Sequence, residues 1–148
     1  MSRSGVMRWK VGLVLLAVSA AAQAASPVGM WKTIDDETGK PKSIVRIWVA
    51  KGKLYGKITK LINPTEPNPK CDKCPSWAKD KPVVGLLIIW DLKKEEGEEW
   101  WDGGSIMDPK NGKIYRCKMR LTDGGKKLEV RGYIGFSLLG RSQTWHKM

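Results

Sequence analysis

The feature that most constrains the fold of this 148-residue chain is a succession of short β-type runs joined by tight turns. The run at 114–121 alternates between apolar and cationic residues, which is the pattern of a strand with one buried face. Turn sequences such as Asn111-Gly112 and the segment 122–125 contain the residues that tight hairpins need. Short turns between consecutive runs predict antiparallel pairing of neighbours.

Eight such runs fit between residues 29 and 147, which predicts an all-β fold: a single up-and-down antiparallel β-barrel of about eight strands. A long Cys-Pro loop at 63–82, with five prolines, interrupts their order. Apolar residues without alternation fill 83–91, and their β-branched members favour a strand buried on both sides over a helix. We expect 135–140 to form a single helical turn over one barrel end. The predicted strands span residues 29–34, 42–49, 54–61, 83–91, 100–107, 114–121, 128–134 and 141–147.

The chain begins with the pattern of a secretory signal peptide. Its positive leader contains Arg3, Arg8 and Lys10. An apolar run at 11–22 follows, too short for the roughly 20 residues of a transmembrane helix. Ala22-Gln23-Ala24 then provides a small-x-small cleavage signal. We therefore expect residues 1–24 to be removed by cleavage near Ala24 or Ala25. The predicted product is one barrel domain at 25–148, periplasmic or secreted, without an integral membrane segment.

Net charge narrows the class of partner. The whole chain carries +12, and the leader holds three cations and no acids, so the remainder carries 12 − 3 = +9. A strongly basic protein attracts nucleic acid or anionic lipid, and an exported chain rarely meets nucleic acid. We therefore expect no nucleic-acid partner. The positive charge either attracts anionic envelope lipid or only keeps the protein soluble. In the first alternative the chain is a non-catalytic interaction protein without a cavity. A basic face of Arg116, Lys118, Arg120 and Arg131 would hold it to anionic lipid or to an envelope partner.

Few residues suit catalysis. His146 is the single histidine and is the third-last residue of this sequence, where a catalytic triad would have weak support. The carboxylates gather in predicted turns, which are solvated positions. We therefore expect no enzyme, no cofactor and no metal.

The pair Cys71 and Cys74, separated by two residues, permits three interpretations. In an oxidising compartment a local disulfide is favoured. Thiol–disulfide exchange is the second, although the pair does not precede a helix that would stabilise a thiolate. A zinc site completed by Cys117 and His146 is the third. Against it, Cys117 lies on the apolar face of its run and resembles a buried core thiol.

Large aromatic side chains either fill a small barrel or line a ligand pocket. Trp77 is distinct because it lies in the Cys-Pro loop, where it could cover a barrel mouth. The candidate ligand-binding residues are Trp77, Trp90, Trp100, Tyr115 and Tyr133.

Several segments resemble an exported bacterial domain-of-unknown-function family, number 2147. They are 27–32, 54–58, 71–75, 84–86, 108–115, 130–133 and 140–145. The resemblance implies a lipocalin-type or calycin-like barrel that binds a small apolar or amphipathic molecule, and it transfers no catalytic residue. Within it, Gly29-Met30-Trp31 has the form of the Gly-x-Trp opening of lipocalins, in which a basic residue of the last strands packs over the Trp. Arg131 or Arg141 is implied in that role, and Trp145 closes the motif.

Overall fold

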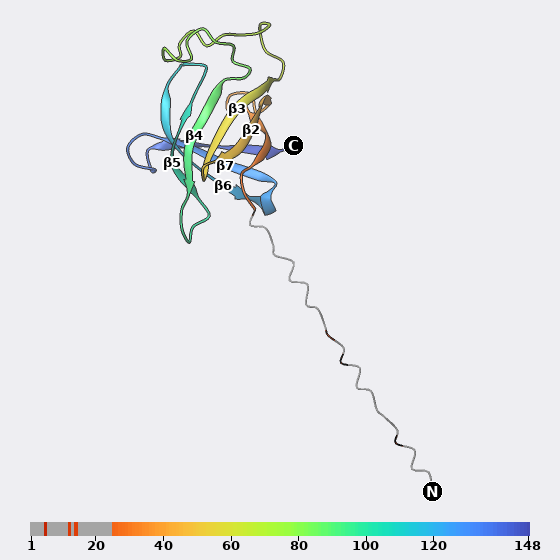
Figure 1. Cartoon of the computed structure of the whole chain (residues 1–148). Coiled ribbons are helices and arrows are strands. Elements are labelled where there is room, and N and C mark those ends of the chain that lie inside the picture. The colour runs from red at the N-terminus through yellow and green to blue at the C-terminus, as the bar shows by residue number, and fades with distance from the viewer. Residues whose placement is uncertain (1–4, 6–11, 13, 15–24) are drawn as a thin grey trace.

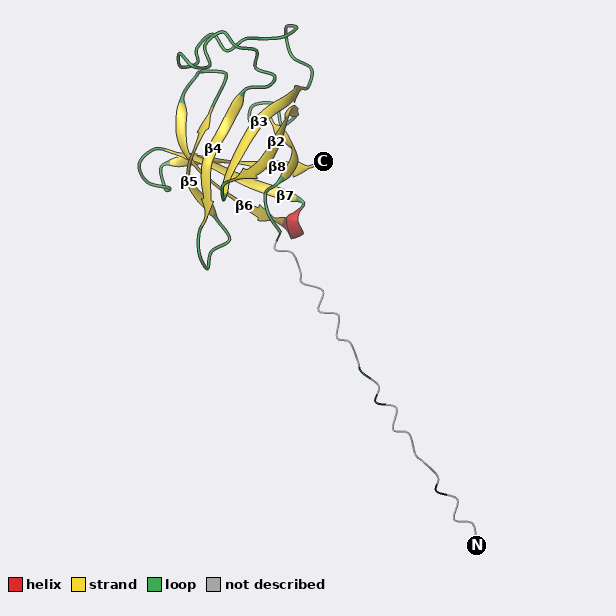
Figure 2. Ribbon diagram, in the orientation of Figure 1, coloured by secondary structure: helices red, strands yellow, loops and turns green. Residues whose placement is uncertain are grey.

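Eight antiparallel strands close into one barrel in the computed structural model of the chain, which describes residues 5, 12, 14 and 25–148 (Figures 1 and 2). Each strand pairs with the next in sequence, and the last pairs with the first, so the predicted up-and-down barrel is confirmed. The signal peptide expected at 1–24 lies almost wholly outside the described residues. The strands are β1 (Gly29–Ile34), β2 (Pro41–Ala50), β3 (Lys53–Leu61), β4 (Leu87–Lys94), β5 (Trp101–Met107), β6 (Ile114–Thr122), β7 (Lys127–Tyr133) and β8 (Gly140–Lys147).

The described part of the chain has little helix. A short 3-10 segment, η1 (Asp123–Gly125), joins β6 to β7. Within the described residues there is no helix of the length and apolar character that crossing a membrane requires.

The fourth strand begins at Leu87, four residues later than predicted. Gly85 adopts a positive φ of 92° and donates its N–H to the carbonyl of Ile58 at 2.6 Å, which turns the chain before it can extend. The Cys-Pro loop therefore spans residues 62–86. Its extra residues, 83–86, supply apolar side chains to the loop rather than to the sheet.

The segment after β7 does not form the predicted helical turn. Ile134 donates its N–H to the carbonyl of Leu139 at 3.0 Å, which closes a hairpin loop, and Gly135 turns the chain with a φ of 70°. We name residues 134–139 the β7–β8 tip. Because its side chains point outward, it does not cover the barrel end.

The barrel interior is filled by inward side chains from all eight strands. Residues directly opposite each other in antiparallel strands share a face, and such pairs include Trp31 with Val45 and Met119 with Val130. The Trp31 indole donates its N–H to the carbonyl of Pro27 at 2.8 Å, so its one polar atom is satisfied. The largest fully buried side chains inside the barrel include Trp31, Val45, Ile47, Leu54, Ile89, Leu92, Met119 and Leu128.

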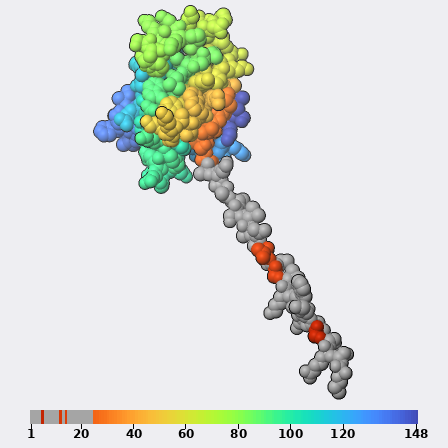
Figure 3. Space-filling view, in the orientation of Figure 1, coloured from red at the N-terminus to blue at the C-terminus, as the bar shows by residue number. Residues whose placement is uncertain are grey.

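One end of the barrel carries the four connections that follow β1, β3, β5 and β7, and we call it the loop end. The Cys-Pro loop lies over this end, as its yellow-green colour shows in Figure 3. Lys110 of the β5–β6 hairpin forms a 3.6 Å ion pair with Glu37 of the β1–β2 turn. Gly112 of the same hairpin lies directly against the backbone of Lys73 and Cys74, where a Cβ would clash. Three of the four connections at this end, those after β1, β3 and β5, are therefore joined by contacts.

Candidate functional site

The Cys-Pro loop is an ordered structure. Cys71 donates its N–H to the carbonyl of Lys81, and Asp80 donates its N–H back to the carbonyl of Cys71, both at 2.9 Å. The carbonyl of Pro75 accepts N–H groups from Ala78 and Lys79 at 2.8 Å. Since these bonds join residues about ten positions apart as well as neighbours, they give the loop a defined shape on which a site can form.

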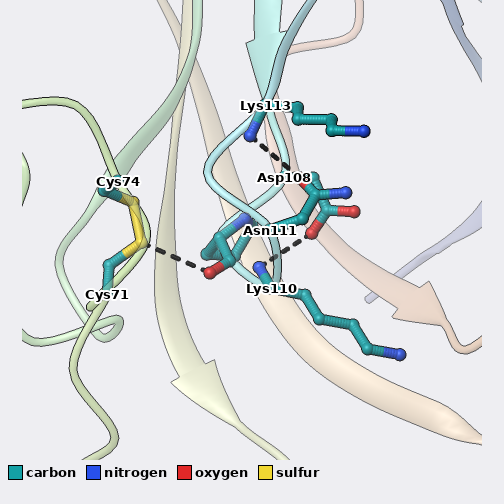
Figure 4. The surroundings of a disulfide bond; sticks show 7 residues. Cys71, Cys74, Asp108, Lys110, Asn111 and Lys113 are labelled. Atoms are coloured by element: carbon teal, nitrogen blue, oxygen red, sulfur yellow. Dashed lines mark hydrogen bonds between the residues drawn. A yellow bond between two sulfur atoms is a disulfide. The ribbon is translucent and has the colours of Figure 1, made fainter.

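A disulfide between Cys71 and Cys74 staples the loop, as the first interpretation of this pair predicted (Figure 4). Both cysteines are buried. The Cys71 sulfur lies 3.3 Å from the carbonyl oxygen of Pro109. Because a disulfide sulfur carries no hydrogen, this approach is a polar contact rather than a hydrogen bond. The disulfide thus ties the loop to the neighbouring β5–β6 hairpin.

Two side-chain hydrogen bonds fix the turn of the β5–β6 hairpin, which lies beside the disulfide. The Asp108 carboxylate accepts the N–H of Lys110, and the Asn111 amide oxygen accepts the N–H of Lys113, each at 2.9 Å (Figure 4). Such bonds hold Asp and Asn in tight turns. The hairpin therefore presents a fixed surface to the Cys-Pro loop.

The zinc and exchange alternatives have little geometric support. Two of the four donors of the zinc set are bonded to each other as the disulfide. Cys117, the third, is fully buried on β6, and burial raises the pKa of its thiol well above the ordinary range. Among the described residues, no three Cys, His, Asp or Glu side chains cluster as metal ligands would. An attacking thiolate would also need access to sulfurs that are buried.

Two of the candidate ligand-binding aromatics meet at the Cys-Pro loop. Trp77 from the loop and Trp90 from β4 pack edge to face, with ring centroids 5.7 Å apart. Trp77 remains 44% exposed in this position, although it is large and apolar. It forms one wall of a hollow of about 340 Å³ between the loop and the start of β4. The other lining residues are Lys81, Pro82, Val84, Gly85, Leu86 and Leu87.

A second hollow of about 240 Å³ adjoins the first and shares Val84 with it. It lies between the end of β3 and the prolines at the beginning of the Cys-Pro loop. Its lining residues are Thr59, Lys60, Leu61, Pro64, Asn68, Pro69 and Val84. None of the fully buried interior side chains lines either hollow. Both hollows therefore belong to the loop end.

The remaining three aromatic candidates lie apart from this pair. Trp100 precedes β5 and is covered by the cations of Lys118 and Arg120, 4.3 and 4.5 Å from its ring centre. Tyr133 donates its hydroxyl to Asp102 at 2.7 Å on the outer face of the barrel. Burial and this carboxylate raise the pKa of Tyr133. Tyr115 faces inward on β6, opposite Ile106.

The cation over Trp31 is Lys147, whose ammonium lies 5.8 Å from the ring centre. The arginines that the resemblance implied make other contacts. Arg141 forms a 3.2 Å ion pair with Asp36, and Arg131 donates hydrogen bonds to the carbonyls of the β7–β8 tip. Gly29 opens β1, and Trp145 packs into the interior opposite Leu128.

The predicted basic face is partly neutralised by its own neighbours. Arg120 bonds Glu129 at 2.8 Å and lies 3.8 Å from Glu99. A second basic surface, which the sequence analysis did not single out, covers β1, β2 and β3. These three strands contain no acidic residue, a signal that was present in the sequence. Their cations are Lys32, Lys42, Arg46, Lys53, Lys57 and Lys60.

Comparison with known proteins agrees with the class that this architecture defines, a lipocalin-like closed barrel. Residues 29–147 match the family model described as "Uncharacterized protein conserved in bacteria (DUF2147)". The chain belongs to this family. A solved structure, "Protein HP1028 from the human pathogen Helicobacter pylori belongs to the lipocalin family", is similar with a TM-score of 0.72 and 21% identity over 84% of each chain. At this identity the likeness concerns the fold alone. No curated protein matches the chain.

Proposed function

We propose that this lipocalin-like protein binds a small apolar or amphipathic molecule in the bacterial envelope and does not catalyse a reaction on it. The observation that carries the proposal is the half-exposed Trp77, held edge-on against Trp90 beside the 340 Å³ hollow. Ligand pockets are typically concave, mostly apolar and at least about 300 Å³ in volume. The exposed part of the Trp77 ring is apolar surface that a ligand in this hollow would remove from water, which favours binding.

The chemistry of the lining favours a ligand with an acyl chain and an anionic head. Val84, Leu86 and Leu87 provide apolar contact, and Trp77 provides a broad planar surface. Lys81 at the same hollow and Lys60 at the adjoining one supply ammonium groups for a carboxylate or phosphate. A short fatty acid or a lysophospholipid combines these features. The expected export signal would bring the protein to the compartment where such molecules occur.

Isothermal titration with dodecanoate tests the proposal. We expect the wild-type protein to bind and Trp77→Ala to bind at least about tenfold more weakly, since truncation of a Trp at a binding hot spot typically costs 2 kcal/mol or more. Trp48→Ala is the matched control. Trp48 stacks on Tyr55 with ring centroids 6.0 Å apart, away from both hollows. Its removal should leave the affinity unchanged.

Dodecanol extends the titration to a ligand of the same chain length without an anionic head. If the head interacts with Lys81, the neutral alcohol should bind more weakly than dodecanoate, and Lys81→Gln should remove the difference. Equal affinities of wild type and Trp77→Ala for dodecanoate would contradict the assignment of the site. Absence of binding by the wild type would contradict the proposed function itself.

A further inference from the structure

The β7–β8 tip exposes an unusual concentration of apolar side chains. Between Tyr133 and Arg141 the sequence contains no charged residue. The exposed fractions of its large side chains are 67% for Ile134, 75% for Phe136, 89% for Leu138 and 66% for Leu139. Single exposed apolar residues are common, but a contiguous group of this size marks an interaction surface.

The tip is held in this exposed shape. Within its hairpin, Leu139 donates its N–H to the carbonyl of Phe136 at 2.9 Å. Arg131 on β7 reaches over the loop and donates to the carbonyls of Ser137 and Leu138 at 2.6 and 3.3 Å. A third bond joins its guanidinium to the hydroxyl of Ser142 at 3.1 Å. These bonds hold the backbone of the tip in the shape that exposes its apolar side chains.

Cations surround the base of the tip. Arg116 on β6 pairs opposite Tyr133 and lies exposed, with its guanidinium 5.9 Å from the centre of that ring. Among the described residues, neither Arg116 nor Arg131 forms an ion pair. Arg141 follows the tip directly and is shared with Asp36. The arrangement is an apolar projection with three arginines at its base, which outnumber the neighbouring carboxylates Asp36 and Asp102.

We propose that the β7–β8 tip is a membrane-docking element that inserts its apolar side chains into an anionic phospholipid surface. The acyl region would receive Phe136, Leu138 and Leu139, and the lipid phosphates would lie level with Arg116 and Arg131. Apolar insertion combined with attraction to anionic headgroups is the general basis of peripheral binding. The net charge of +9 predicted for residues 25–148 adds to the attraction. A lipid surface is favoured over a protein partner because cations lie at the base of the tip and the four large side chains that it exposes are all apolar. This inference does not depend on the proposed ligand site, since the tip residues line neither hollow.

Vesicle flotation tests the proposal with the purified protein. We expect the wild type to float with phosphatidylglycerol–phosphatidylcholine vesicles and to bind phosphatidylcholine vesicles more weakly. Phe136→Ser with Leu138→Ser should reduce the partition into the anionic vesicles at least about tenfold, because two large side chains lose their apolar transfer. Arg116→Gln should reduce it about fivefold and weaken its salt dependence.

Met30→Ser with Val49→Ser is the matched control. These side chains are also exposed and apolar, at 37% and 44%, but they lie away from the β7–β8 tip. The double control should float like the wild type. Since the tip side chains support no buried contact, the tip variant should keep the far-ultraviolet spectrum and dodecanoate affinity of the wild type.

Three results would overturn the proposal. One is wild-type protein that does not float with anionic vesicles. Another is a tip variant that floats as well as the wild type. The third is a wild-type dimer that the tip substitutions convert to a monomer without changing flotation, because the tip would then be an interface between copies of this chain.

Discussion

Burial by the barrel controls the chemistry of Cys117. Its side chain has no exposed surface, and burial, with a smaller contribution from the charge of Asp102, raises the pKa of the thiol. An alkylating reagent needs both access and a thiolate. At pH 8.5, close to the ordinary thiol pKa, we expect iodoacetamide to modify Cys117 at least about a hundredfold faster in denaturant than in the native protein. Mass spectrometry of quenched samples gives the two rates.

The Cys71–Cys74 disulfide provides the internal control in this experiment, since without reductant it should remain unmodified in both states. Rapid alkylation of the native protein would show that the interior opens readily at β6, contrary to this packing.

Individual residues could be predicted where a local rule fixes them. Alternation along 114–121 was enough to place Cys117 on the inner face, and the spacing of Cys71 and Cys74 was enough to favour a local disulfide. The cation over Trp31 depends instead on the register in which β8 meets β1, which places Lys147 opposite Trp31. Residues 31 and 147 are distant in sequence, so no local pattern records that register.

Among the elements of the fold, the Cys71–Cys74 disulfide makes only a modest contribution to the free energy of unfolding. It closes a short ring, for which chain entropy gives a stabilisation of about 2 kcal/mol. We therefore expect Cys71→Ala with Cys74→Ala to lower the free energy of unfolding by about that amount while the barrel stays folded. Urea denaturation followed by tryptophan fluorescence measures the change. Dodecanoate binding should weaken as well, because the loop that carries Trp77 loses the covalent cross-link that holds its shape.

Cys117→Ala is the comparison for the loss of a buried cysteine without loss of a disulfide. An unchanged free energy of unfolding in the Cys71 and Cys74 double variant, or loss of the barrel, would contradict this division between loop and sheet.

The sequence patterns predicted some elements wrongly. The shape of these elements depends on contacts across the barrel end. The apolar run 83–91 predicted a strand, but the N–H of Gly85 bonds Ile58 on β3 and turns the chain before β4 begins. The hollow beside Trp77 follows from that turn, so its lining could not be predicted either. The β7–β8 tip was expected to cover the barrel because it is apolar. Arg131 holds the backbone of the exposed tip by hydrogen bonds that belong to the folded state, so no local pattern records them.

For the whole molecule, closure is the property that turn spacing predicts least directly. Regular turns predict that consecutive strands pair, which accounts for seven of the eight strand pairings, here called seams. The eighth joins β1 to β8 through two residue pairs, Trp31 with Lys147 and Lys32 with His146, whereas β2 and β3 are matched along almost their full length. The barrel thus has one seam much shorter than the rest.

We expect the β1–β8 seam to open before the barrel unfolds. Amide protons that bond across it, such as the Met148 N–H to the carbonyl of Met30, should exchange through local opening at a lower free energy than those between β2 and β3. Native-state hydrogen exchange followed by NMR gives both values.

A disulfide across the seam, from Lys32→Cys with His146→Cys, should slow exchange there, since directly paired strand positions lie at a distance that a disulfide spans. Arg46→Cys with Lys57→Cys joins the well-matched β2–β3 pair and should leave the seam unchanged. Seam amides that already exchange as slowly as those of β2 and β3 in the wild type would show instead that the barrel opens only as a unit.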